Sequence, residues 1–164
     1  MLLTSLVSVT KGSPLDMPNR LKLLVAEDSQ MDAFILQRTF EQTGVAINAH
    51  FVRDGQEATD YLEGVGEFGD RAKYPLPALI LLDLKMPRLN GFDVLKWLKL
   101  QPEHRTTPVI IFSGSDDHGD ILRAYSLGAS SYMVKPTHTA EMPDLVRVLD
   151  AYWRRFGRVP VSGN

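Results

Sequence analysis

The chain has 164 residues, of which 44% are hydrophobic and 23% are charged, and its formal net charge at pH 7 is −2. This length and composition fit one globular domain, and the charge gives no indication of a nucleic-acid or anionic-membrane partner. The absence of cysteine excludes disulfides, thiol catalysis and thiolate metal sites, and it fits the cytoplasm, where we expect the protein to act.

Residues 1–19 precede the first predicted strand and are expected to form a disordered or loosely packed tail. The stretch MLLTSLVSV resembles the apolar part of a signal peptide, but it lacks the basic residues and the cleavage site that signal peptides carry. No apolar run approaches the roughly 20 residues that a transmembrane helix needs. We therefore expect no membrane association, and Met17 is an alternative start.

The first predicted elements are a strand, a helix and a second strand. Residues 21–26 form an apolar run that is typical of a strand covered on both faces of a parallel sheet. A helix is expected over 31–44, because Ser29 and Asp32 resemble a capping box and a glycine ends the segment. Residues 46–52 alternate in polarity, as a half-exposed edge strand does.

The middle of the chain continues this alternation. A helix is expected over 54–64, which begins with a capping pattern and ends in glycine. The Gly- and Pro-rich stretch 64–77 is expected to be a surface loop with solvated charges. The apolar run 78–82 predicts a strand, and 91–101 predicts a helix that stops before Pro102.

The last third adds two strands and two helices. Apolar runs predict strands at 108–112 and 131–134, with a helix over 117–128 between them. Pro143 fits only in the first turn of the final helix. That helix has an apolar face formed by Leu145, Leu149, Tyr152, Trp153 and Phe156.

This order of strands and helices predicts an α/β fold, in which a doubly wound five-stranded parallel sheet is connected by right-handed crossovers. No repeat or interdomain linker is present. We therefore expect one domain over residues 20–156, with an extended final helix, and a short tail over 157–164.

Polar residues follow four of the predicted strands directly. They are Glu27 and Asp28, Asp83, Ser113, and Lys135. Because parallel strands end at one edge of the sheet, where open α/β folds bind ligands, we expect these side chains to converge.

Three carboxylates at one edge repel one another by about 4 kcal/mol per pair at an effective dielectric constant near 20. A bound divalent cation removes this cost, and Mg²⁺ prefers one or two carboxylates with water and then attracts phosphate oxygens. The nearby ammonium and hydroxyl groups offer further contacts to phosphate. The set therefore fits the transfer of a phosphoryl group onto a carboxylate.

Glu27-Asp28 and the segments LLDLKMPRLNG, FSG and YMVKP, in this order, resemble the receiver domain of two-component response regulators over roughly residues 20–156. The resemblance implies a flavodoxin-like receiver fold with strand order 2-1-3-4-5. It also implies that Asp83 is the phosphoacceptor and that a sensor histidine kinase is the donor.

The resemblance also implies a metal site for Mg²⁺ (or Mn²⁺). Asp28, Asp83 and the backbone carbonyl of Lys85 would hold the ion, while Glu27 would act through water. Lys85 stands at a position that tunes the lifetime of the acyl phosphate in this family, so the sequence leaves that lifetime open.

The remaining family positions concern the phosphoryl group and the switch. Lys135 would pair with the phosphoryl group, Ser113 would donate a hydrogen bond to it, and Gly114 would leave access to it. Tyr132 would be the aromatic switch residue, and the bond before Pro136 would be cis. The plainer alternatives are a turn serine at 113 and an ordinary half-buried strand tyrosine at 132.

A narrower resemblance concerns the partners. The long 64–77 loop, DGQEATDYL, the segment LQPEHRTTPVIIFSGSDDHGDILRAYSLGA and the YWRRF extension resemble stand-alone regulators of bacterial and cyanobacterial phytochrome histidine kinases. A downstream protein, which the sequence does not identify, would read the switch. Tyr152, Trp153 and Phe156 predict a homodimer through the final helix, the alternative being that the aromatic residues cap the core.

Two other functions are weighed against a phosphoacceptor switch. Phosphatases of the aspartyl-phosphate type resemble this edge, but they carry a second Asp two residues after the nucleophile, where this chain has Lys85. A pseudo-receiver would be a constitutive binding module, which the complete set of acids, Ser and Lys disfavours. We therefore expect a switch rather than an enzyme.

Overall fold

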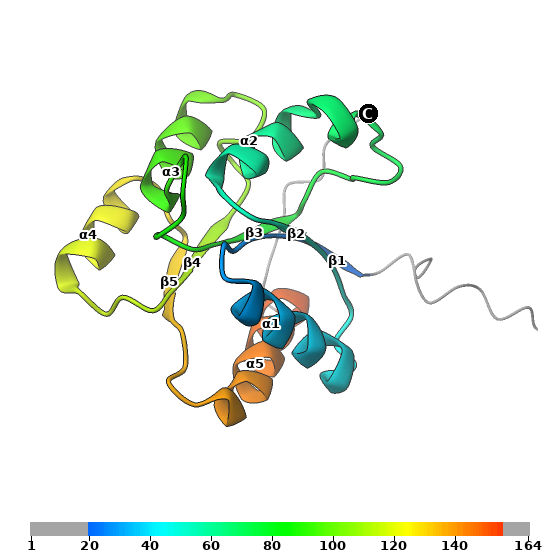
Figure 1. The fold of residues 1–164 in the computed structure, drawn as a ribbon, viewed down its shortest axis with the longest axis vertical. Coiled ribbons are helices and arrows are strands. Elements are labelled where there is room, and N and C mark those ends of the chain that lie inside the picture. Colours follow the sequence, from blue (N-terminus) through cyan, green and yellow to red (C-terminus); the bar gives the residue numbers. More distant parts are fainter. Residues whose placement is uncertain (1–19, 156–164) are drawn as a thin grey trace, which may run out of the picture.

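Five parallel strands form the centre of the structure (Figure 1), a computed structural model that describes residues 20–155. The predicted tails and Phe156 lie outside the described residues. The strands are β1 (Leu21–Ala26), β2 (Ile47–Val52), β3 (Leu79–Leu82), β4 (Val109–Ser113) and β5 (Ser131–Val134). Their order in the sheet is β2-β1-β3-β4-β5, which confirms the predicted topology.

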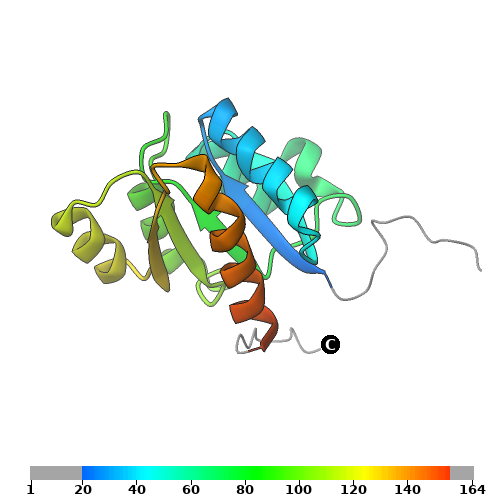
Figure 2. The same ribbon diagram turned by 90° about the horizontal axis from the view of Figure 1, so that it is seen from below.

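Helices cover both faces of this sheet. They are α1 (Gln30–Thr43), α2 (Gly55–Glu63), α3 (Gly91–Leu100), α4 (His118–Ser126) and α5 (Met142–Arg155), with short 3₁₀ helices η1 (Gly66–Gly69) and η2 (Thr139–Glu141). Helices α1 and α5 lie side by side on one face, and α2, α3 and α4 lie on the other (Figures 1 and 2). Within residues 20–155, no helix has the length and apolar character needed to cross a bilayer.

The register of the central strands aligns their C-terminal ends. Ala26 of β1 pairs with Leu82 of β3, and the backbone N–H of Asp83 donates to the carbonyl of Ala26 over 3.1 Å. At the other side, the N–H of Lys135 donates to the carbonyl of Ser113 over 2.8 Å. The residues that follow β1, β3, β4 and β5 therefore emerge at one edge, as the sequence predicts.

The predicted helix boundaries are confirmed at their caps. The hydroxyl of Ser29 accepts from the N–H of Asp32 over 3.2 Å, and the carboxylate of Asp54 accepts from the N–H of Glu57 over 2.9 Å. Gly44 ends α1 in the left-handed conformation, with φ of 64°, where a side chain would be strained. The cap at Ser29 fixes the first turn of α1 directly after the end of β1.

The segment 64–77 differs from the predicted loop with solvated charges. It contains η1, and the rings of Phe68 and Tyr74 pack against Tyr61 of α2 with centroids 5.3 and 6.0 Å from it. Arg71 donates hydrogen bonds of 2.7 Å to each of the carbonyls of Tyr61 and Leu62. The prediction was wrong for Arg71, because the last carbonyls of a helix lack partners within the helix and a nearby guanidinium satisfies them.

Helix α5 contains Pro143 in its first turn, as predicted. Val146 and Leu149 are buried, and Trp153 packs against the same core cluster. Tyr152 has 57% of its surface exposed. The core-capping alternative therefore describes Trp153, whereas Tyr152 is accessible to a partner.

Candidate functional site

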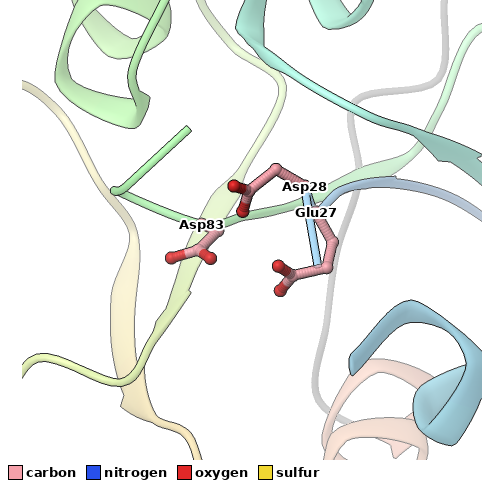
Figure 3. A group of neighbouring side chains, drawn as sticks. All are labelled: Glu27, Asp28 and Asp83. Carbon is pink, nitrogen blue, oxygen red and sulfur yellow. The ribbon is translucent and has the colours of Figure 1, made fainter. Parts of the chain in front are cut away.

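Three acidic residues meet at the C-terminal edge of the sheet (Figure 3). Each of Glu27, Asp28 and Asp83 offers a carboxylate oxygen, and these oxygens lie within 4.8 Å of one another. Glu27 and Asp83 are 5% and 6% exposed, whereas Asp28 is open to solvent. The predicted convergence of the three acids is confirmed.

The chain after β3 folds back closely on Asp83. The N–H of Gly91 donates to the carbonyl of Leu84 over 2.9 Å. A Cβ atom at position 91 would lie 2.3 Å from the carbonyl oxygen of Asp83, so only glycine permits this approach. The N–H of Lys85 lies 3.5 Å from Asp83 Oδ1, which places Lys85 beside this carboxylate.

Lys135 connects β5 to the acidic cluster. Its ammonium nitrogen lies 2.5 Å from Glu27 Oε2 and 3.0 Å from Asp83 Oδ2. The side chain is only 15% exposed, so water screens these ion pairs weakly. Lys135 is thus brought into the site as predicted.

The electrostatics of the cluster follow from burial and from this lysine. Burial raises the pKa of Glu27 to about 7, although the hydrogen bond from Lys135 opposes the shift. Burial alone would lower the pKa of Lys135, but its hydrogen bonds to Glu27 and Asp32 and the charge of Asp83 outweigh burial and raise it. Lys135 therefore stays charged, and it only partly offsets the cost of ionising Glu27.

The donor set fits a hard divalent cation. All the side-chain donors of the cluster are carboxylate oxygens, which are the ligands that Mg²⁺ and Mn²⁺ prefer. A cation there would favour the ionised form of Glu27, which burial disfavours. The chemistry of the residues therefore supports the predicted metal site.

Ser113 is the last residue of β4, and Tyr132 lies in the neighbouring strand β5. Ser113 is 1% exposed, and its hydroxyl oxygen accepts from the N–H of Ser115 over 3.3 Å. The hydroxyl of Tyr132 donates to the carbonyl of Ser115 over 2.8 Å. The loop after β4 therefore links the two predicted switch residues.

One detail of the site differs from the sequence-based expectation, and another agrees with it. No peptide bond among residues 20–155 is cis, so the bond before Pro136 is trans and the predicted cis bond is wrong. The trans isomer is the intrinsically favoured one by about 0.5–1 kcal/mol. A Cβ at Gly114 would meet nothing within 4 Å, in agreement with an open approach to the site.

Asp32 makes a contact that the capping pattern at the start of α1 does not predict. Asp32 Oδ2 lies 2.9 Å from the ammonium of Lys135. The position of Asp32 in the first turn of α1, four residues after Asp28, was the available signal. Because α1 begins at the same edge of the sheet, an acid in its first turn lies within reach of the site.

Comparisons with known proteins agree with this geometry. The family model of the response regulator receiver domain matches residues 23–147. The probable methanogenesis regulatory protein FilR2 of Methanothrix harundinacea is 33% identical over 149 residues, which cover 91% of this chain and 94% of FilR2.

Solved structures show the same similarity. The response regulator RPA3017 in red light signalling of R. palustris has a TM-score of 0.81 and 37% identity, with 87% of this chain and 99% of that chain covered. The phosphorylated cyanobacterial phytochrome response regulator RcpA has a TM-score of 0.79 and 29% identity, with 87% and 100% covered. A further similar structure contains Mn²⁺.

Proposed function

This chain belongs to the response regulator receiver domain family, and from that premise we propose that it is a phosphoacceptor switch of a two-component system. Asp83 accepts a phosphoryl group from the phosphohistidine of a sensor histidine kinase. The observation that carries the proposal is the cluster of Glu27, Asp28 and Asp83, in which the ammonium of Lys135 contacts Glu27 and Asp83.

In the proposed reaction an oxygen of Asp83 attacks the phosphorus of phosphohistidine. The new O–P bond forms as the P–N bond breaks, and the imidazole leaves with the electron pair. Lys135 stabilises the negative charge on the phosphoryl oxygens, and the hydroxyl of Ser113 donates to one of them. Burial of Asp83 and Lys135 strengthens these contacts.

The metal site in this proposal is formed by Asp28, Asp83 and the backbone carbonyl of Lys85, with Glu27 acting through water. Mg²⁺ or Mn²⁺ bound there supplies charge neutralisation to the phosphoryl oxygens. The cluster of three carboxylate oxygens supports this assignment.

Phosphorylation would act as a switch through Ser113 and Tyr132. The phosphoryl group would attract the hydroxyl of Ser113, which accepts a hydrogen bond from the N–H of Ser115. The carbonyl of Ser115 in turn accepts a hydrogen bond from the hydroxyl of Tyr132. A change at Ser113 therefore reaches the ring of Tyr132 and the surface around α4 and α5, where a downstream protein would bind.

A phytochrome kinase is the proposed donor. The similarity to RcpA, a phytochrome response regulator, and to RPA3017, a regulator in red light signalling, supports this pairing. Phosphotransfer profiling against a panel of sensor kinases tests it. A phytochrome kinase is expected to label the protein fastest, and preferential labelling by another class of kinase would contradict the pairing.

Labelling with acetyl phosphate tests the phosphoacceptor itself. The wild type is expected to gain one phosphoryl group with Mg²⁺ and none with EDTA, because the acids repel phosphate without a cation. Asp83→Asn is expected to abolish labelling, whereas Asp144→Asn, an 85% exposed acid on α5, should label normally.

Three outcomes distinguish the candidate functions. Stoichiometric labelling lost only in Asp83→Asn supports the switch. Steady turnover of a small phosphoester would instead indicate a phosphatase. Absence of labelling with Mg²⁺ bound would indicate a pseudo-receiver.

A further inference from the structure

The ammonium of Lys135 is shared among three carboxylates. A lysine has three N–H donors and no acceptor. Its nitrogen lies 2.5 Å from Glu27 Oε2, 2.9 Å from Asp32 Oδ2 and 3.0 Å from Asp83 Oδ2. All three donors are therefore engaged before any phosphoryl group arrives.

The three acceptors differ in their surroundings. The side chains of Glu27 and Asp83 are 4% and 8% exposed and belong to the acidic cluster. The side chain of Asp32 is 42% exposed and comes from the first turn of α1. Because water can replace Lys135 at Asp32, this ion pair is the one that breaks at least cost.

We infer that Asp32 is a positioning residue that holds one donor of Lys135 in the unphosphorylated protein and competes with an incoming phosphoryl oxygen for it. The inference rests on the proposed function and adds a control of how readily the site is phosphorylated. Phosphorylation releases Lys135 from Asp32 and leaves the carboxylate of Asp32 to water.

The same contact affects the cation. While Asp32 also accepts from the ammonium of Lys135, this positive charge neutralises Glu27 and Asp83 less completely. These two acids therefore attract a cation more strongly. Loss of the Asp32 charge therefore weakens cation binding and frees a Lys135 donor for the phosphoryl group. A plain helix-dipole role of Asp32 at the start of α1 would change stability alone.

The test compares Asp32→Asn with two matched variants. Asp32→Glu keeps the charge at the same position, and Glu41→Gln removes one charge from an exposed position farther along α1. The dissociation constant of Mg²⁺ is measured by calorimetry without phosphodonor, and the initial rate of labelling by acetyl phosphate is measured at saturating Mg²⁺.

For Asp32→Asn both quantities are expected to rise roughly two- to fivefold, the range of a partly exposed ion pair. In Asp32→Glu the Mg²⁺ dissociation constant and the labelling rate should both stay close to the wild-type values. Glu41→Gln should change neither quantity. If either quantity in Asp32→Asn matches that in Glu41→Gln, the inference is overturned. If the wild type takes no label, the proposed function fails and the inference fails with it. If the wild type is labelled but Asp32→Asn behaves like Glu41→Gln, only the inference fails.

Discussion

Gly91 shows how one residue without a side chain positions Asp83, the proposed phosphoacceptor. Its backbone lies so close to Asp83 that a methyl group would be 2.3 Å from the carbonyl oxygen of Asp83. The neighbouring atoms are backbone, which cannot rotate away as a flexible side chain can. The loop between β3 and α3 must move if position 91 gains a side chain.

We therefore expect Gly91→Ala to lower the free energy of unfolding by about 1–3 kcal/mol, the usual cost of overpacking. The better helix propensity of alanine at this first helical position offsets only part of that cost. Chemical denaturation provides the measurement, and labelling of Asp83 should also slow.

Gly114→Ala is the matched control, because a Cβ at that glycine meets nothing within 4 Å. It should change the free energy of unfolding by less than about 0.5 kcal/mol. Equal stability of the two alanine variants would show that the close approach at Gly91 is not a constraint.

At the scale of elements, helix α5 has one apolar face that is buried and another that is exposed to solvent. Val146 and Leu149 are 0% and 3% exposed and face the sheet. Val148 and Tyr152, one turn apart, are 64% and 57% exposed. They border a groove of about 350 Å³ between α5 and β5, which Met133 and Ser131 also line. This apolar surface supports the predicted homodimer, in which Tyr152 is the more exposed of the two aromatic residues that line the groove.

The wild type is accordingly expected to sediment as a dimer at tens of micromolar, a concentration that populates a typical weak interface. Tyr152→Ala should shift it toward monomer, because a large aromatic contact is lost. Leu100→Ala, at a 78% exposed position of α3, serves as the control for removing an exposed apolar side chain. A monomeric wild type at this concentration would contradict the dimer.

Helix caps could be predicted from the sequence, whereas a helix-end contact from a residue farther along the chain could not. Helix ends at Ser29, Gly44 and Asp54 were predictable, because caps depend on residues within one turn. The role of Arg71 was not, because its guanidinium reaches the end of a helix nine and ten residues earlier in the chain. Composition alone therefore described the 64–77 segment as a plain loop.

At the scale of the whole molecule, the convergence of the site residues followed from one topological rule, whereas the strand order followed from the resemblance to receiver domains. Parallel strands end at a common edge, so residues after β1, β3, β4 and β5 had to meet there. The hydrogen-bond partner of Asp32 was not predictable, because it depends on how far a lysine from β5 extends across the edge. Peptide isomerism at Pro136 was likewise misjudged, since it depends on the surrounding structure.

The proposed function requires the three carboxylates to hold a divalent cation beside Asp83, the proposed phosphoacceptor. An anomalous difference map from a crystal soaked in Mn²⁺ tests this directly. The strongest peak is expected between Asp28 and Asp83, within reach of Glu27 through water. A strongest peak elsewhere, or no peak among these acids at saturating Mn²⁺, would rule out the proposed metal site.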